Sequence, residues 1–208
     1  MSTEKVKYPR TYHLPWSHGL QNDDKRIETT EFLENARVVV TAKMDGENCS
    51  MYRDFIHARS LDSGPHESRD AVKNIWGSFR YDIPEGFRVC GENLYAKHSI
   101  GYDNLESYFL GFGVWDGMTC LSWKETKDWL SLFGLSVVPI LYEGPYSENI
   151  LKNLVNPWDE GLVVRVTDSF TYDEFALKVA KYVRSNHVQT SEHWMSQKIE
   201  PNKLKESS

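Results

Sequence analysis

The sequence has few cysteines, no long apolar run and no excess of positive charge. No uninterrupted apolar stretch approaches the roughly 18 residues of a membrane-spanning helix, and the N-terminus, MSTEKVKYPR, lacks the apolar core of a signal peptide. The cysteines, Cys49, Cys90 and Cys120, are far apart and lie among apolar residues. They argue against a disulfide framework or a zinc site, and we expect them to be reduced core residues. We therefore expect a cytoplasmic protein without a membrane segment.

The formal net charge of -6 argues against a protein that coats a polyanion. It does not exclude a local basic groove, because five Lys and one Arg stand against two Glu between Lys178 and Lys205. The phosphate-binding patterns GxGxxG and GxxxxGK[ST] are absent, which argues against a dinucleotide fold or a P-loop. With 208 residues, 40% of them hydrophobic, the chain is long enough to bury the core of one domain.

Short segments rich in β-branched and aromatic residues, bounded by Gly, Pro or Asp, predict strands. They lie at 38–43, 48–55, 87–94, 108–115, 137–142 and 161–166. Apolar spacing and capping signals predict helices at 68–79, 122–133, 147–154 and 185–199. The first 36 residues are irregular and predict a surface wrap. This order, which is not βαβ, predicts an α+β fold of mostly antiparallel sheets with flanking helices, in a single domain over 1–208.

The stretch Val38–Asn48, VVVTAKMDGEN, joins a hydrophobic strand to a tight turn. Its β-branched residues suit a buried strand, and Asp45 with Gly46 forms a pair that favours a two-residue hairpin turn. Lys43 is therefore expected at a strand end, with its amine aimed at one atom. The alternative is a solvated lysine beside a hairpin, which is the common fate of this residue type.

Several charged residues lie in segments that otherwise predict buried strands. They are Glu92 in RVCGENLY, Glu160 and Arg165 in EGLVVR, and Lys178 in FALKVAK. An unpaired buried charge is too costly to keep, so these side chains must pair with one another or with a ligand. Internal ion pairs are the alternative to a ligand site.

The same residues, in the same order, resemble the motifs of the covalent nucleotidyltransferase superfamily of polynucleotide ligases and mRNA capping enzymes. Lys43, Asp45 and Gly46 are similar to its first motif, KxDG, whose lysine takes the nucleotide covalently. Asn48 extends the match to KxDGxN, which is similar to the RNA ligase 2-like branch. The resemblance implies a nucleotidyltransferase (adenylyltransferase) domain in which Lys43 is the catalytic nucleophile.

Later motifs of the superfamily have counterparts along the rest of the chain. Arg59 resembles the arginine that reaches the ribose and the RNA end, and Glu92 resembles the acid that holds the ribose hydroxyls. Phe112, in YFLGFGVWD, would stack on the purine, and Glu160 is similar to the metal-binding glutamate of the fourth motif. The resemblance implies Glu160 as a ligand of Mg²⁺, with Asp45 as a further candidate. The nucleotide-binding residues that it implies are Ala42, Lys43, Asn48, Arg59, Glu92, Phe112, Glu160, Lys178 and Lys181.

The fifth motif departs from the pattern of the superfamily. It is usually KxK, whereas this chain has Lys178 and, displaced by one position, Lys181. In a continuous strand Lys181 would point to the opposite face, unless a bulge intervenes. We therefore expect Lys178 to contact the α-phosphate. Its charge, with that of a bound metal, is expected to lower the pKa of Lys43 toward neutrality.

The function implied by the resemblance is that of an ATP-dependent RNA ligase. With ATP and Mg²⁺, or Mn²⁺, Lys43 would become adenylylated, AMP would pass to an RNA 5′-phosphate, and a 3′-hydroxyl would displace AMP. Only 30 residues follow Lys178, so we expect no C-terminal OB barrel, a basic helical tail over 182–208, and a monomer.

Two other functions remain open from the sequence. A DNA ligase is the nearest alternative, and Asn48 is the residue that argues against it. A catalytically weak module that holds nucleotide or RNA is the alternative from another class, and the altered fifth motif is its support.

Overall fold

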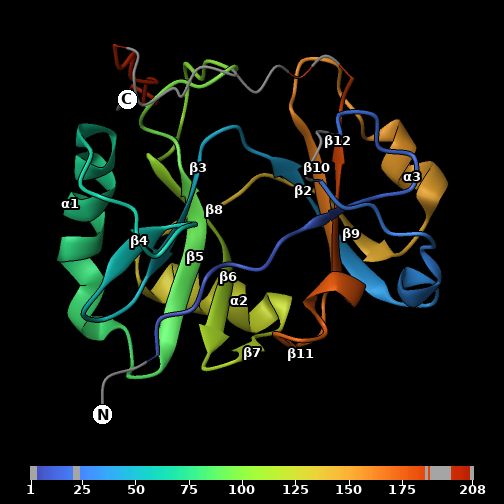
Figure 1. The fold of residues 1–208 in the computed structure, drawn as a ribbon, viewed down its shortest axis with the longest axis horizontal. Coiled ribbons are helices and arrows are strands. Elements are labelled where there is room, and N and C mark those ends of the chain that lie inside the picture. The colour runs from blue at the N-terminus through green and yellow to red at the C-terminus, as the bar shows by residue number, and fades with distance from the viewer. Residues whose placement is uncertain (1–3, 21–23, 186, 188–197, 207–208) are drawn as a thin grey trace.

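Two mostly antiparallel sheets form the framework of the protein (Figure 1). The structure is a computed structural model and describes residues 4–20, 24–185, 187 and 198–206. The first, which we call the β2 sheet, has the order β1 (Tyr12–His13), β12 (Val179–Val183), β10 (Gly161–Val166), β2 (Arg37–Lys43) and β9 (Ile140–Pro145). The second, the β5 sheet, has the order β11 (Phe170–Thr171), β7 (Thr119–Cys120), β6 (Phe109–Asp116), β5 (Phe87–Asn93), β3 (Glu47–Met51) and β4 (Ile56–Ala58). Strand β8 (Ser136–Val137) lies parallel to β6.

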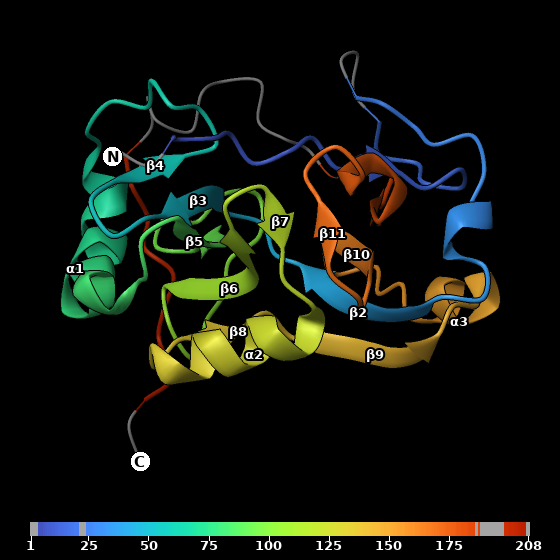
Figure 2. The same ribbon diagram turned by 90° about the horizontal axis from the view of Figure 1, so that it is seen from below.

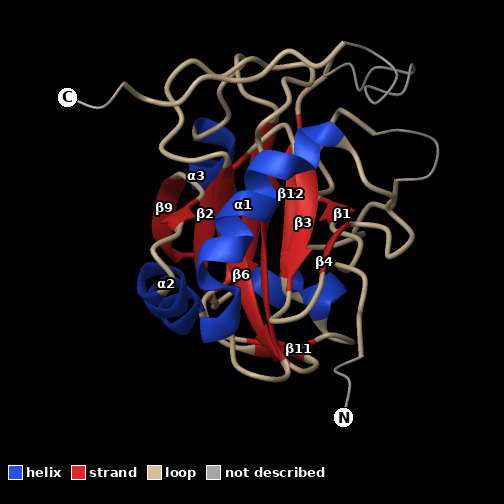
Figure 3. Ribbon diagram, turned by 90° about the vertical axis from the view of Figure 1, so that its left-hand side faces the viewer, coloured by secondary structure: helices blue, strands red, loops and turns tan. Residues whose placement is uncertain are grey.

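Helices flank both sheets, which confirms the predicted α+β class. They are α1 (Asp70–Phe79), α2 (Trp123–Leu132) and α3 (Glu148–Asn153), with short 3₁₀ helices η1 (Glu31–Leu33), η2 (Glu67–Arg69), η3 (Arg80–Asp82) and η4 (Phe175–Leu177). Apolar residues of α1 and α2 share a buried cluster with the β5 sheet, whereas Leu151 of α3 is buried against the β2 sheet. Figures 1 and 2 accordingly show α1 and α3 at opposite ends of the molecule, and Figure 3 shows α1 in front of the strands.

Local signals in the sequence locate α2 correctly. The Ser122 hydroxyl accepts the Glu125 N–H at 3.3 Å, and the Glu125 carboxylate accepts the Ser122 N–H at 3.1 Å, which is the predicted capping box. Gly134, with φ of 68°, follows the end of the helix. The strand predicted at 137–142 is instead divided into β8 and β9, because Pro139 lies between them and has no N–H for a sheet ladder.

The turn at Asp45 and Gly46 does not form the predicted hairpin. Strand β2 pairs with β10 and β9, while β3 pairs with β4 and β5, so the chain crosses from one sheet to the other at this point. Gly46 is required here because space is short, and not because of the backbone conformation of a hairpin turn. A Cβ at this position would lie 2.4 Å from the carbonyl oxygen of Asn93, so glycine allows the crossing to pass close to β5.

The helix predicted at 185–199 falls mainly on residues outside those described. Within the predicted helical tail, Tyr182 and Val183 belong to β12, and residues 198–206 contain no helix. That last segment lies along the loop after β5, where Asn202 is buried and donates to the Leu94 carbonyl at 2.8 Å.

The cysteines are free and buried, as predicted. Within the described residues, no helix has the length and apolar character that crossing a membrane requires.

Candidate active site

Lys43 ends β2 and lies directly opposite Gly161, the first residue of β10. Glu160 precedes Gly161, and its Oε1 lies 2.6 Å from Nζ of Lys43. A Cβ on Gly161 would stand 1.9 Å from the backbone oxygen of Tyr182, so only glycine lets β10 approach β12 this closely. The sequence EG therefore places a buried carboxylate next to the lysine amine.

A cavity of about 430 Å³ lies beside this ion pair, with walls from both sheets and from the N-terminal segment. Asp45 lines it, together with eight of the nine expected nucleotide-binding residues. These eight are Ala42, Lys43, Asn48, Arg59, Glu92, Phe112, Glu160 and Lys181. The structure thus brings together side chains that are spread over 140 positions of the sequence, at about one cavity.

Lys178 is the expected residue that the structure places elsewhere. It follows η4, donates its N–H to the Phe175 carbonyl, and is not among the residues that line the cavity. Side chains alternate between the two faces of a sheet only within a strand, and β12 begins at Val179, one residue after Lys178. The face on which Lys181 lies therefore cannot be counted from Lys178. Lys181, opposite Val163 of β10, lines the cavity instead. Of the two lysines, the cavity lining thus includes Lys181 and not Lys178.

The charges around Lys43 also differ from the expectation. Burial alone would lower the pKa of Lys43, but Glu160 and Glu92 outweigh burial and raise it above its ordinary value. Burial raises the pKa of Glu92, the positive charge of Lys43 lowers it, and the negative charge of Glu160 raises it further. The resulting pKa of Glu92 is about 8. At neutral pH Lys43 is therefore protonated, and Glu92 keeps its proton.

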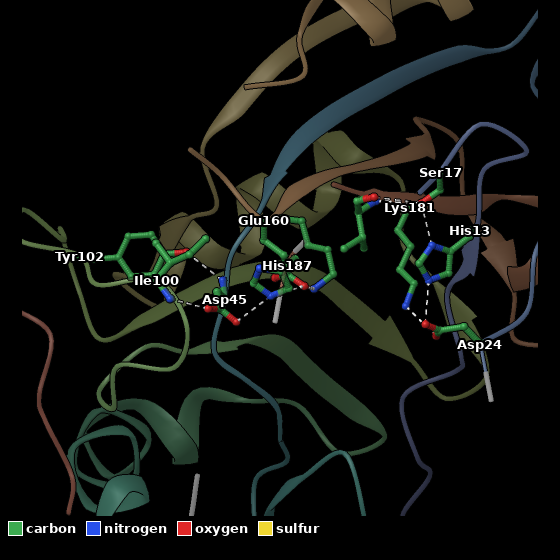
Figure 4. Close-up of polar contacts among 11 residues, drawn as sticks. His13, Ser17, Asp24, Asp45, Ile100, Tyr102, Glu160, Lys181 and His187 are labelled. Carbon is green, nitrogen blue, oxygen red and sulfur yellow. Dashed lines mark hydrogen bonds and ion pairs between the residues drawn. The ribbon is translucent and has the colours of Figure 1, made fainter. Parts of the chain in front are cut away.

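Asp45 is held in place by the loop that follows β5. Its Oδ2 accepts the Ile100 N–H at 2.8 Å, and its own N–H donates to the Tyr102 hydroxyl at 2.9 Å (Figure 4). Burial would raise the pKa of Asp45, but His187 and the Ile100 N–H outweigh burial and lower it. Asp45 is thus a fixed anion at the cavity wall.

His187 completes a group of three side chains that could hold a metal ion. Its Nε2 lies 3.5 Å from both Asp45 Oδ1 and Glu160 Oε1, and one ligand atom from each of the three residues falls within 4.8 Å of the others (Figure 4). The second carboxylate oxygen of Glu160 is buried and has no hydrogen-bond partner among the described residues. Two carboxylates and an imidazole suit a divalent cation.

Sequence reasoning missed His187 and the N-terminal contribution to the cavity. The first 36 residues were expected to be a surface wrap, yet Tyr8 and Asp24 line the cavity. The Tyr8 ring lies edge-on to Phe112, with 5.3 Å between the ring centroids. No motif marks these positions, because the residues that share the cavity with them are distant in the sequence.

Asn48 and Arg59 differ in how they meet the cavity. Asn48 Oδ1 is buried and has no hydrogen-bond partner among the described residues, although it faces Glu92 across the β3–β5 ladder. Arg59 follows β4 and is exposed at the cavity rim. The first is therefore an unused polar group within the site, and the second is accessible to a large ligand.

Comparison with known proteins gives one family and a set of similar structures. The family model described as RNA ligase matches residues 36–183. A Naegleria gruberi RNA ligase mutant with AMP and Mn is 19% identical, with a TM-score of 0.57 over 88% of this chain and 59% of that chain. The Naegleria gruberi RNA ligase with PPi is 21% identical, with a TM-score of 0.56 over 88% of this chain and 59% of that chain.

An archaeal ATP-dependent RNA ligase is 19% identical, with a TM-score of 0.57 over 86% of this chain and 48% of that chain. This chain thus spans only about half to three fifths of the neighbours it resembles. At such low identity these structures show a shared fold. No curated protein sequence matches the chain.

Proposed function

Because the chain belongs to the RNA ligase family, we propose that it is an ATP-dependent ligase that joins RNA 3′-hydroxyl and 5′-phosphate ends through AMP bound covalently to Lys43. The observation that carries this proposal is the Lys43–Glu160 contact of 2.6 Å at the wall of the cavity. A lysine held there is positioned as a nucleophile and is not simply solvated. The AMP, ATP and PPi complexes of the Naegleria gruberi neighbours support a nucleotide as the ligand.

In the first step, Nζ of Lys43 would form a bond to the α-phosphorus of ATP while the bond to pyrophosphate breaks. The raised pKa means that the amine must first lose a proton, and Oε1 of Glu160 is placed to hold it. Lys181, on the far side of β10 from Lys43, provides a positive charge at the cavity wall for the reacting phosphate. We assign this role to Lys181 and no longer to Lys178.

The donor set of Asp45, Glu160 and His187 fits Mg²⁺ or Mn²⁺, since it includes a buried carboxylate oxygen that has no hydrogen-bond partner in the described part of the chain. When bound, such an ion would supply positive charge that lowers the pKa of Lys43 and stabilises the leaving pyrophosphate. Without it, the carboxylates around Lys43 favour the unreactive ammonium form.

The remaining side chains would orient the nucleotide and the RNA. Phe112, supported by Tyr8, offers an aromatic face to the purine. Glu92 and Asn48, neighbours across two strands, would take the ribose hydroxyls. Arg59 at the rim would meet the RNA end. AMP would then pass to the 5′-phosphate, and attack by the 3′-hydroxyl would release AMP and seal the strand.

Incubation with ATP labelled at the α-phosphate tests the first step. We expect label on the wild-type protein in the presence of Mg²⁺ or Mn²⁺, none on Lys43→Ala, and much less on Lys181→Ala. Lys178→Ala is the matched control, because this lysine lies outside the cavity lining. Absence of label on the wild type, or label on Lys43→Ala, would overturn the proposal. Loss of label in Lys178→Ala alone would refute the assignment of Lys181.

Sealing of nicked duplexes tests the choice of nucleic acid. Substrates with RNA at the 3′-hydroxyl side should be joined in preference to all-DNA nicks of the same sequence. Equal sealing of the two would contradict the RNA assignment and leave the lysyl-AMP step intact.

A further inference from the structure

Three side chains of the N-terminal segment form a chain of contacts that ends at Lys181 (Figure 4). Nζ of Lys181 lies 3.2 Å from Oδ1 of Asp24, and Oδ2 of Asp24 lies 3.1 Å from Nε2 of His13. Nδ1 of His13 lies 2.7 Å from the Ser17 hydroxyl. His13 is completely buried, and Asp24 and Lys181 are each less than a fifth exposed. The chain is therefore built into the protein and is not a surface ion pair.

Backbone pairing fixes the position of these residues. Strand β1 runs parallel to β12, with His13 directly beside Lys181. The His13 N–H donates to the Lys25 carbonyl at 2.8 Å, and the His13 carbonyl accepts the Ile27 N–H at 2.9 Å. Asp24 immediately precedes this pairing, so the sheet itself holds its carboxylate near Lys181.

The Asp24 carboxylate decides which nitrogen of His13 carries the proton. Nε2 lies 3.1 Å from Oδ2 of Asp24, and a carboxylate at this distance favours the neutral tautomer with its proton on Nε2. In that tautomer Nδ1 accepts the Ser17 hydroxyl, whose oxygen in turn accepts the Val183 N–H at 2.9 Å. Burial and the charge of Lys181 lower the pKa of His13 to about 4, so the ring is neutral at physiological pH. Lys181 thus donates to the Asp24 carboxylate, and Nε2 of His13 lies against the other oxygen of the same group.

A carboxylate in the wall of a triphosphate cavity requires an explanation, because its charge repels the ligand. Asp24 lines the same cavity as Lys43 and Lys181. Its charge would weaken nucleotide binding unless it contributes in another way. The contact with Lys181 offers that contribution, since a long flexible side chain gains from being held in one geometry.

We infer that Asp24 and His13 are positioning residues, which hold the amine of Lys181 at the place where it meets the reacting phosphate during AMP transfer to Lys43. This inference rests on the proposed function and adds two residues for which no motif was found in the sequence. Asp24 acts by restraining Lys181, and His13 acts by restraining Asp24.

Single-turnover transfer from α-labelled ATP tests the inference, with the rate constant and the apparent affinity for ATP measured separately. Asp24→Ala should lower the rate constant at saturating ATP on the order of tenfold to a hundredfold, as expected for a misplaced reacting group. Because a repulsive charge is removed, apparent ATP affinity should be unchanged or higher. Glu143→Gln is the matched control. It removes a carboxylate whose Oε2 lies 3.2 Å from Nζ of Lys127, and neither residue lines the cavity.

A double-mutant cycle separates positioning from a general effect on folding. If Asp24 acts through Lys181, Asp24→Ala should change the rate less than about threefold in a Lys181→Ala background. Equal effects in both backgrounds would overturn the inference. So would a loss confined to thermal stability, with the rate constant of the folded protein unchanged.

Two replacements of His13 distinguish its two nitrogens. His13→Gln can place an amide near the position of Nε2 and should retain more activity than His13→Asn, whose amide reaches only toward Ser17. The opposite order would refute the role of His13. If the wild type labels and both Asp24→Ala and His13→Asn label at the same rate, only this inference fails. If the wild type does not label, the proposed function fails as well.

Discussion

Glu92→Gln should change how the stability of the protein depends on pH. Burial and Glu160 raise the pKa of Glu92 from an ordinary 4.5 to about 8, against the attraction of Lys43. Between these two values the folded protein keeps a proton that the unfolded chain has released. Stability is therefore complete at low pH and falls as the pH rises through this window. Glutamine keeps the shape of the side chain and removes this loss.

The size of the effect follows from the shift. Each pKa unit corresponds to about 1.4 kcal/mol, so the complete transition is worth at most about 5 kcal/mol, of which about 2 kcal/mol falls between pH 6 and pH 8. Urea unfolding followed by tryptophan fluorescence, in chelator so that no cation binds, would measure it. The gap between Glu92→Gln and the wild type should widen in favour of the variant as pH rises, whereas Glu143→Gln should show no such trend. A constant gap would refute the reasoning.

Three other variants probe the framework of the site. Gly161→Ala should destabilise the protein by more than about 3 kcal/mol in urea unfolding, since its Cβ would meet the backbone of β12 at 1.9 Å, while Gly64→Ala has nothing within 4 Å and should be nearly neutral. Asn202→Ala should cost about 2 kcal/mol, because the buried Leu94 carbonyl and the partly buried Tyr102 N–H lose their partner; an unchanged unfolding midpoint would contradict this. The wild type should lose about 2 kcal/mol of unfolding free energy through His13 when the pH falls from 7 to 5, because this histidine binds a proton near pH 6.5 in the unfolded chain and only near pH 4 in the folded protein. His13→Gln should not show this loss. Parallel pH profiles of stability for the two proteins would show that His13 is not responsible.

Local signals in the sequence predicted the elements whose cause is local. The capping box of Ser122 and Glu125 and the β-branched run before Lys43 each act within a few residues, and the structure confirms both. The family resemblance added the identity of distant partners such as Glu92 and Glu160, which pattern alone could only identify as unusual charges in strands.

Where the structure differs from what the sequence suggests, the cause is non-local. Asp45 and Gly46 favour a hairpin locally, but the pairing of strands depends on the whole sheet. Here the chain passes from the β2 sheet to the β5 sheet at this turn. The choice between Lys178 and Lys181 depends on where η4 ends and β12 begins, and one residue of difference changes the face on which a side chain lies. Asp24 could not be found because the pairing of Lys25 and Ile27 with His13, far from any motif, places it at the cavity.

Lys43 lies directly before the crossing at 44–46, where the chain passes from the β2 sheet to the β5 sheet. The chain also passes between the sheets at Val138 and Pro139, and the Ala42 N–H donates to the Pro139 carbonyl at 2.9 Å. These two passages therefore lie side by side next to the nucleophile. A substitution that changes how the sheets meet at 138–139 would thus act directly on the strand end that carries the lysine amine.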